Sequence, residues 1–177
     1  MKKILPLEII QFLGISISVL CALNCSQGFT KIESVKKEGE IKKIEKLNIV
    51  YARGDVDESF VNSFKNKFEM LLAKSNISFT KSEKSSLSLK KDMIEADSLS
   101  WNSYVIEIKL DRFTTMSKSF KVDSHIKNRL KEKIWASKME VPMSYIYLVV
   151  AGFPNPSGSG SKGASKLFST LKKDGMF

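Results

Sequence analysis

Residues 47–72, LNIVYARGDVDESFVNSFKNKFEMLL, contain a strand pattern followed directly by a helix pattern. Leu47 to Tyr51 form a short apolar run between polar residues, which predicts a buried strand. A turn follows, and Asp57 is placed to accept hydrogen bonds from the first N–H groups of a helix. Apolar side chains then recur at helical spacing, at Phe60, Phe64, Phe68, Leu71 and Leu72. We expect this helix to pack on a sheet through that stripe.

The chain after this helix predicts further strands. Ile77 to Phe79 reads as a short strand, and Lys81 to Ser100 as a polar segment with a possible short helix around Met93 to Ala96. Tyr104 to Asp111 gives the clearest strand in the chain, because apolar and polar side chains alternate along it with period two.

The last third begins with a polar hairpin or loop region and a strand from Trp135 to Val141, ended by Pro142. Tyr145 to Val150 is expected as a fully apolar strand. A loop rich in Pro, Gly and Ser, residues 152–163, should then lead into a short final helix. Three side chains of this helix are expected to face the sheet, and two residues to end it: Leu167, Phe168 and Leu171, then Asp174 and Gly175.

These elements predict an α/β (α+β) fold, with a mixed β-sheet and two main helices packed on one face. The chain has 177 residues. We expect one domain over residues 46–177, large enough to bury a core without disulfides or metals.

The first 25 residues resemble a bacterial lipoprotein export signal. Lys2 and Lys3 precede an uncharged apolar run from Phe12 to Leu23, which falls short of the roughly 20 residues that cross a bilayer. We therefore expect residues 1–24 to be a signal peptide and Cys25 to be the lipidated residue. Processing at Cys21 is the less favourable alternative, because bulky Leu20 would stand before the cut. Ordinary signal cleavage and an uncleaved anchor are two further alternatives.

Residues 25–45 are expected to form a polar tether between the lipid and the domain. Lysines and glutamates alternate here with few apolar side chains, so little surface can be buried to offset the entropy of folding. A short helix from Ile41 to Glu45 is the alternative.

The cysteine and histidine counts exclude several kinds of site. The two cysteines, Cys21 and Cys25, both lie in the signal region, so the mature domain has no disulfide, no cysteine-ligated metal and no cysteine nucleophile. The single histidine, His125, lies in a lysine-rich stretch, and we expect it to be a solvated surface residue. We therefore expect no metal and no cofactor.

The formal net charge is +10, and it becomes +9 when residues 1–24 are removed, because they contain two lysines and one glutamate. Export makes nucleic acid an improbable partner for this basic surface. Anionic lipid headgroups, cell-wall polymers and acidic proteins fit better. A lysine-rich solvated surface with no specific partner is the simplest explanation of the charge.

Two short motifs have a structural explanation as well as a functional one. Gly158, Gly160 and Gly163 satisfy the glycine spacing of a dinucleotide-binding turn, but no strand follows with the ribose-binding acid. We expect a flexible loop that tolerates alanine. Arg53, Gly54 and Asp55 spell an adhesion tripeptide, and a strand-to-helix turn explains them equally well.

The predicted domain resembles small bacterial envelope lipoproteins whose periplasmic domain is similar to the amino-terminal domain of the Tol translocation protein and to the curli-secretion lipoprotein. The resemblance covers Leu47 to the end. It rests on the opening strand before an amphipathic helix, on the strand beginning at Trp135 and Ala136, and on residues 172–175, KKDG, after a short helix. It implies an envelope interaction module without enzymatic activity.

We therefore expect a lipid-anchored, non-catalytic protein-interaction or envelope-assembly module with a partner in the envelope. Ser26 and Gln27, rather than Asp, follow Cys25, which for such lipoproteins implies the outer membrane, with the domain facing the periplasm or the cell surface. One alternative is an envelope hydrolase that uses the carboxylates of Asp55, Asp57 and Glu58, although capping explains these acids. The other is a surface adhesin.

Overall fold

The computed structural model describes residues 30–37, 43–85, 104–112, 119–148 and 151–177. The predicted signal peptide, Cys21, Cys25 and the possible helix at Met93 to Ala96 lie outside the described residues.

Six strands form the main sheet, in the spatial order β1-β6-β5-β4-β2-β3. Strand β2 is parallel to its neighbours β3 and β4, and the other pairs are antiparallel. The six strands are β1 (Lys31–Lys36), β2 (Lys46–Arg53), β3 (Ser78–Ser85), β4 (Tyr104–Arg112), β5 (Ser119–Lys127) and β6 (Lys133–Pro142).

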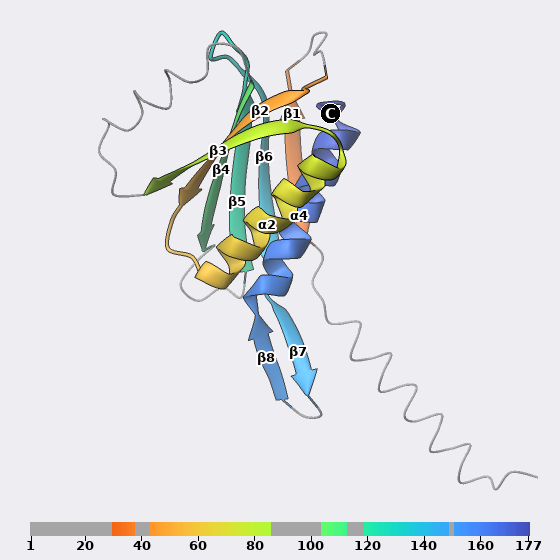
Figure 1. The fold of residues 1–177 in the computed structure, drawn as a ribbon. Coiled ribbons are helices and arrows are strands. Elements are labelled where there is room, and N and C mark those ends of the chain that lie inside the picture. Colours follow the sequence, from red (N-terminus) through yellow and green to blue (C-terminus); the bar gives the residue numbers. More distant parts are fainter. Residues whose placement is uncertain (1–29, 38–42, 86–103, 113–118, 149–150) are drawn as a thin grey trace, which may run out of the picture.

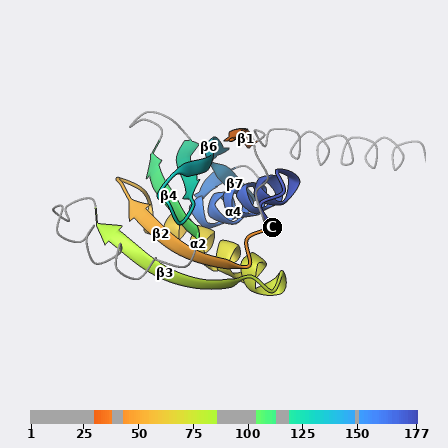
Figure 2. The same ribbon diagram turned by 90° about the horizontal axis from the view of Figure 1, so that it is seen from above.

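Two helices, α2 (Glu58–Lys74) and α4 (Pro156–Lys173), lie side by side on one face of this sheet, as Figures 1 and 2 show from two directions. The predicted α/β class, with a mixed sheet and two helices on one face, is confirmed. The core lies between the helices and the sheet.

Helix α2 begins as its sequence predicts. The Asp57 carboxylate accepts hydrogen bonds from the backbone N–H groups of Ser59 at 2.8 Å and Phe60 at 3.3 Å. The predicted stripe is buried: Phe60, Phe64, Phe68 and Leu72 each have an exposed fraction of 0%, and Leu71 is half-buried. The Phe60 ring stacks on Phe120 of β5 with 4.0 Å between ring centres. This aromatic contact joins the helix to the middle of the sheet.

The structure differs from the expected polar tether over residues 25–45. Lys31–Lys36 form β1, an antiparallel edge strand that pairs with β6 from Lys31↔Glu140 to Lys36↔Trp135. Ile44 also belongs to the core and is 2% exposed. The ordered fold thus includes part of residues 25–45, because pairing with β6 satisfies backbone groups in a segment whose side chains are mostly exposed.

Strand β5 occupies a region that we expected to be a polar hairpin or loop. Its side chains alternate between the core and the opposite face, with Phe120, Val122 and Ile126 buried. Ser124 takes the remaining core position, where its hydroxyl lies 2.8 Å from the hydroxyl of Ser137 on β6. That mutual hydrogen bond allows a polar side chain at a buried position.

The segment from Tyr145 onward also differs from its prediction. β7 (Ser144–Leu148) pairs with β8 (Ala151–Asn155) in a separate two-stranded hairpin, and it does not join the main sheet. The expected loop over residues 152–163 consists of β8 and the first turns of α4, so the final helix is longer than predicted. Asn155 caps it by accepting a hydrogen bond from the Gly158 N–H at 3.0 Å. Leu167, Phe168 and Leu171 are buried as expected.

Candidate functional site

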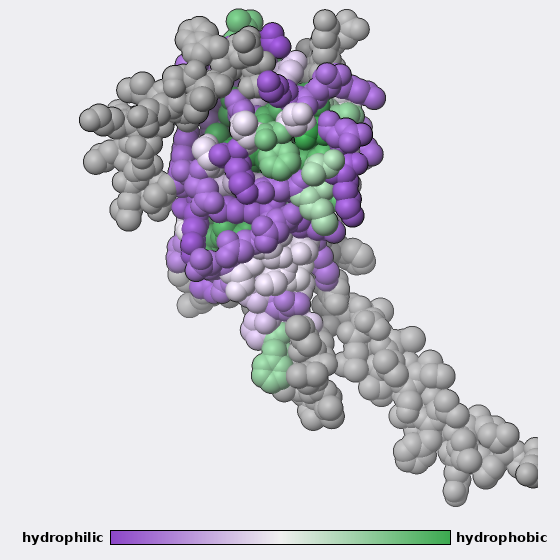
Figure 3. Space-filling view, in the orientation of Figure 1, coloured by the Kyte–Doolittle hydropathy of each residue, from purple (hydrophilic) through white to green (hydrophobic). Residues whose placement is uncertain are grey.

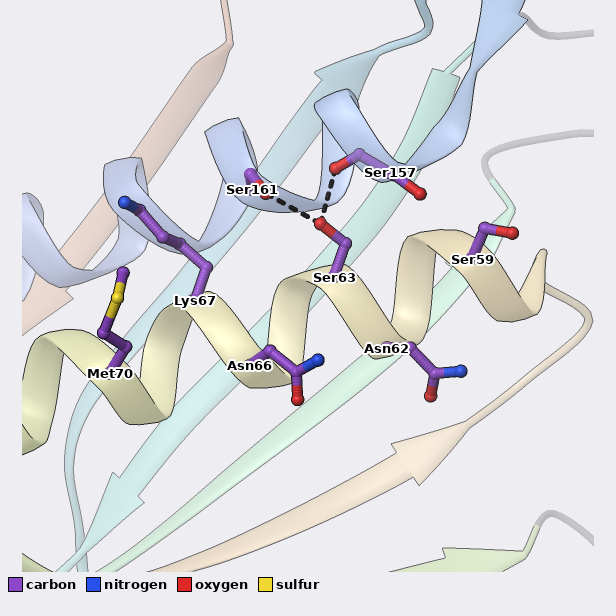
Figure 4. A pocket seen from close by; sticks show the side chains of 8 residues that line it. All are labelled: Ser59, Asn62, Ser63, Asn66, Lys67, Met70, Ser157 and Ser161. Atoms are coloured by element: carbon purple, nitrogen blue, oxygen red, sulfur yellow. Dashed lines mark hydrogen bonds between the residues drawn. The ribbon is translucent and has the colours of Figure 1, made fainter.

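A shallow groove of about 500 Å³ runs between α2 and α4 on the outer surface of the helical layer. Figure 4 shows its walls, which are mainly short polar side chains. From α2 come Ser59, Asn62, Ser63, Asn66, Lys67 and Met70, and from α4 come Ser157 and Ser161. The α2 residues lie three or four positions apart, so they share the face of the helix that points away from the core.

Ser63 links the two helices at the floor of the groove. Its hydroxyl donates to the backbone oxygen of Ser157 at 2.6 Å and lies 2.7 Å from the hydroxyl of Ser161. Asn62 and Asn66 are exposed along the α2 wall. Their amide groups can both donate and accept hydrogen bonds, so the groove suits a neutral polar ligand or a polar protein segment.

The groove is shallow because glycines in α4 bring the two helix backbones together. A Cβ atom at Gly160 would overlap the backbone oxygen of Phe60 and lie 3.0 Å from the Phe64 nitrogen. A Cβ at Gly163 would lie 3.0 Å from Cγ2 of Val141 and 3.4 Å from the Phe64 ring. The expectation of a flexible loop at Gly158, Gly160 and Gly163 is therefore wrong. These residues lie in a helix, and two of them are buried against α2 and β6.

The groove offers hydrogen bonds and one cation, and no acid–base pair. Its lining residues include no carboxylate and no imidazole, and Lys67 is the only charged side chain among them. Within the described residues, no group of three or more His, Cys, Asp or Glu side chains is arranged to hold a metal ion.

The three acids of the hydrolase alternative lie where β2 leads into α2. Asp57 is engaged as the helix cap, Glu58 lies in the first turn, and Asp55 is exposed in the preceding turn. All three side chains are exposed, and none of them lines the groove.

The Arg53, Gly54, Asp55 tripeptide lies at the same turn. The Arg53 guanidinium donates to the Val56 backbone oxygen at 3.4 Å, and the Gly54 N–H donates to the Leu110 oxygen at 2.8 Å. The turn is therefore held against β4.

His125 lies on β5, on the sheet face opposite the helices, and its side chain is 26% exposed. Its Nε2 lies 3.2 Å from a carboxylate oxygen of Glu107, and the Lys127 ammonium lies 3.0 Å from the other oxygen. The hydrogen bond from His125, with help from Lys127, lowers the pKa of Glu107 to about 2. The expected solvated surface histidine thus lies on the open sheet face, where it is half-buried and belongs to a charge network.

Sequence analysis did not identify the groove. The available signal was the outer stripe of α2, where Ser59, Asn62, Ser63 and Asn66 recur at helical spacing between charged residues. This stripe of uncharged polar side chains is visible in the sequence, but only the position of α4 makes it a groove.

No helix among the described residues is both long enough and apolar enough to cross a membrane. Cys25 lies outside these residues, so its lipidation stays a prediction.

No protein-family model and no curated protein sequence matches the chain. Among solved structures, a PelC dodecamer from Paraburkholderia phytofirmans aligns with a TM-score of 0.51 and 11% identity, over 81% of this chain and 97% of that one. A substituted form of the same PelC gives a TM-score of 0.51 and 12% identity, over 81% and 98% of the two chains.

A neuraminyllactose-binding hemagglutinin homologue from Helicobacter pylori aligns with a TM-score of only 0.37 and 10% identity, over 79% of this chain and 87% of that one. At these identities the comparison with PelC shows a shared fold and nothing more. The resemblance to Tol and curli-secretion domains stays an expectation from the sequence.

Proposed function

We propose that this chain is a lipid-anchored lipoprotein of the cell envelope that acts as a non-catalytic interaction or assembly module. The observation that carries the proposal is the export signal that ends at Cys25, followed after six residues by β1. Because β1 is hydrogen-bonded into the main sheet, a lipid on Cys25 would hold the folded domain close to the membrane.

Binding is proposed because of what the domain presents on its surface. The groove between α2 and α4 offers hydroxyl and amide groups from exposed residues such as Asn62 and Asn66. Hydrogen-bonding side chains beside a small apolar surface such as that of Met70, which is 38% exposed, are typical of the polar parts of protein interfaces. We propose this groove as the surface that contacts a protein partner in the envelope.

The anchor is tested by metabolic labelling with a palmitate analogue. We expect the wild-type protein and Cys21→Ala to be labelled and Cys25→Ala to remain unlabelled, because acylation requires the thiol at the processed position. The labelled protein should be recovered with the outer membrane. Label that persists in Cys25→Ala would refute the assignment, and recovery with the inner membrane alone would refute the location.

The groove is tested by photo-crosslinking in intact cells, with a photoreactive residue in place of Asn66. The matched control replaces Lys138, which is also exposed but lies on β6 at the sheet face opposite the helices. We expect a discrete adduct with another envelope protein from position 66 and none from position 138. Equal adducts from both positions, or an adduct from position 138 alone, would exclude the groove as the contact surface.

A further inference from the structure

The β7–β8 hairpin is the part of the domain that departs most from the charged character of the chain. Asp, Glu, Lys and Arg make up 27% of the sequence, yet residues 141–161, VPMSYIYLVVAGFPNPSGSGS, contain none of them. The two strands include Tyr145, Tyr147 and Phe153, and Phe153 is 53% exposed.

The hairpin extends away from the body of the domain. Figure 1 shows it beyond the end of the main sheet, and Figure 3 shows a hydrophobic residue on it, below a body whose visible surface carries both hydrophilic and hydrophobic residues. In the part of the chain that the structure describes, neither strand pairs with the main sheet. An isolated two-stranded hairpin is at best marginally stable in water, so this one, with Phe153 53% exposed on it, is a candidate contact surface.

The base of the hairpin is held firmly by one buried serine of α4. The Ser159 side chain, 0% exposed, accepts the Ser144 N–H at 2.7 Å and donates to the Pro142 backbone oxygen at 3.0 Å. Strand β8 leads without a gap into α4 at Asn155 and Pro156. The base of the hairpin is therefore hydrogen-bonded to the body of the domain.

The segment that follows the predicted lipid anchor joins the domain at the end of the sheet from which the hairpin departs. Lys31, the first residue of β1, pairs with Glu140, near the end of β6 from which the hairpin departs. Cys25 precedes Lys31 by six residues, which span at most about 20 Å in any conformation. A lipid on Cys25 would thus keep this end of the sheet within about 20 Å of the membrane.

The hairpin and the tether have similar maximum lengths. Leu148, at the end of β7, is eight residues beyond Glu140, or up to about 25 Å at the rise of a strand. A hairpin that points toward the membrane can therefore reach the lipid within the length of the tether.

We propose that the β7–β8 hairpin docks on the lipid bilayer beside the acylated Cys25, with Phe153 at the level of the headgroups. This inference rests on the lipid anchor of the proposed function. Tyrosine and other aromatic side chains favour that interface. The strands do not cross the bilayer, because the unpaired backbone groups at their edges cannot be satisfied in hydrocarbon.

The test uses the full-length acylated protein, reconstituted in vesicles of phosphatidylethanolamine and phosphatidylglycerol with or without bromine on the upper acyl chains. Phe153→Trp places a fluorophore on the hairpin. Leu130→Trp is the matched control, because Leu130 is 78% exposed in the turn after β5, at the opposite end of β6. The wild-type protein supplies the background from its two native tryptophans.

We expect bromine to reduce the fluorescence of the tryptophan at position 153 by about twofold and to leave that at position 130 unchanged, since only an interfacial side chain meets the acyl chains. Mass analysis of Cys25 is made on the same samples. An acylated protein with equal quenching at both positions, or with none at 153, would overturn the docking and leave the anchor standing. A concentration-dependent oligomer without quenching would assign the hairpin to a second copy of the chain and also overturn it. A protein without acyl groups would overturn the anchor and, with it, this inference.

Discussion

Small side chains in α4 decide how the two helices meet. Gly160 lies against the backbone of Phe60, and Ser161 approaches Ser63 closely enough for a hydrogen bond of 2.7 Å. A helix with larger residues at these positions would stand further from α2. The glycine spacing that resembles a dinucleotide-binding turn thus serves helix packing in this chain.

Gly160→Ala tests this close approach. Alanine favours a helix interior over glycine by about 1 kcal/mol, but its Cβ overlaps backbone atoms that cannot move alone. We expect overpacking to outweigh that gain and to lower the free energy of unfolding by about 1–2 kcal/mol. Urea denaturation followed by circular dichroism gives the measurement.

Gly163→Ala is the matched comparison in the same helix. Its Cβ would meet side-chain atoms of Val141 and Phe64, which can shift by a few tenths of an ångström. We expect a smaller loss than for Gly160→Ala. Unchanged stability of Gly160→Ala would show that α4 can move away from α2, and the packing argument would then be wrong.

At the scale of elements, β1 joins two distant parts of the chain. It covers the edge of β6, and the Lys36 ammonium donates to the Asp174 backbone oxygen at 2.9 Å, at the end of α4. The Asp174 carboxylate in turn accepts a hydrogen bond from Trp135 Nε1 at 2.8 Å. The edge strand, the last helix and β6 therefore stabilise one another.

Removal of β1 tests its contribution. We compare a protein that begins at residue 29 with one that begins at residue 43, because both lack the cysteines and both retain the buried Ile44. The shorter protein loses the β1–β6 ladder, and we expect it to be less stable by about 2 kcal/mol. It should also self-associate, because the edge of β6 is exposed.

Thermal denaturation and analytical ultracentrifugation measure the two effects. Equal stability and equal sedimentation of the two proteins would mean that residues 31–36 act only as a spacer, as the sequence first indicated.

At the scale of the whole molecule, the fold separates three surfaces. The helical layer presents the polar groove, and the opposite sheet face presents a charge network around Glu107. The third surface is the apolar hairpin, beside the start of β1. If the hairpin and the lipid define the membrane side, the helical groove and the open sheet face both remain available to partners in the envelope.

Local patterns determined much of this fold. The alternation in β4, the cap at Asp57 and the phenylalanine stripe of α2 are all found where the sequence predicts them, because each depends on neighbours within a few residues. The predicted export signal and the position of both cysteines likewise come from the sequence alone.

Tertiary structure decided the elements whose stability comes from distant partners. β1 has few buried side chains of its own and depends on pairing with the edge of β6. β5 can bury Ser124 in the core because Ser137 of β6 completes its hydrogen bond. Residues 156–163 read as a loop because glycine and serine have weak helix propensity, yet packing against α2 outweighs that propensity. The groove depends on the same kind of long-range contact, and so does the placement of the hairpin at the end of the sheet where β1 begins. No local sequence pattern contains these contacts.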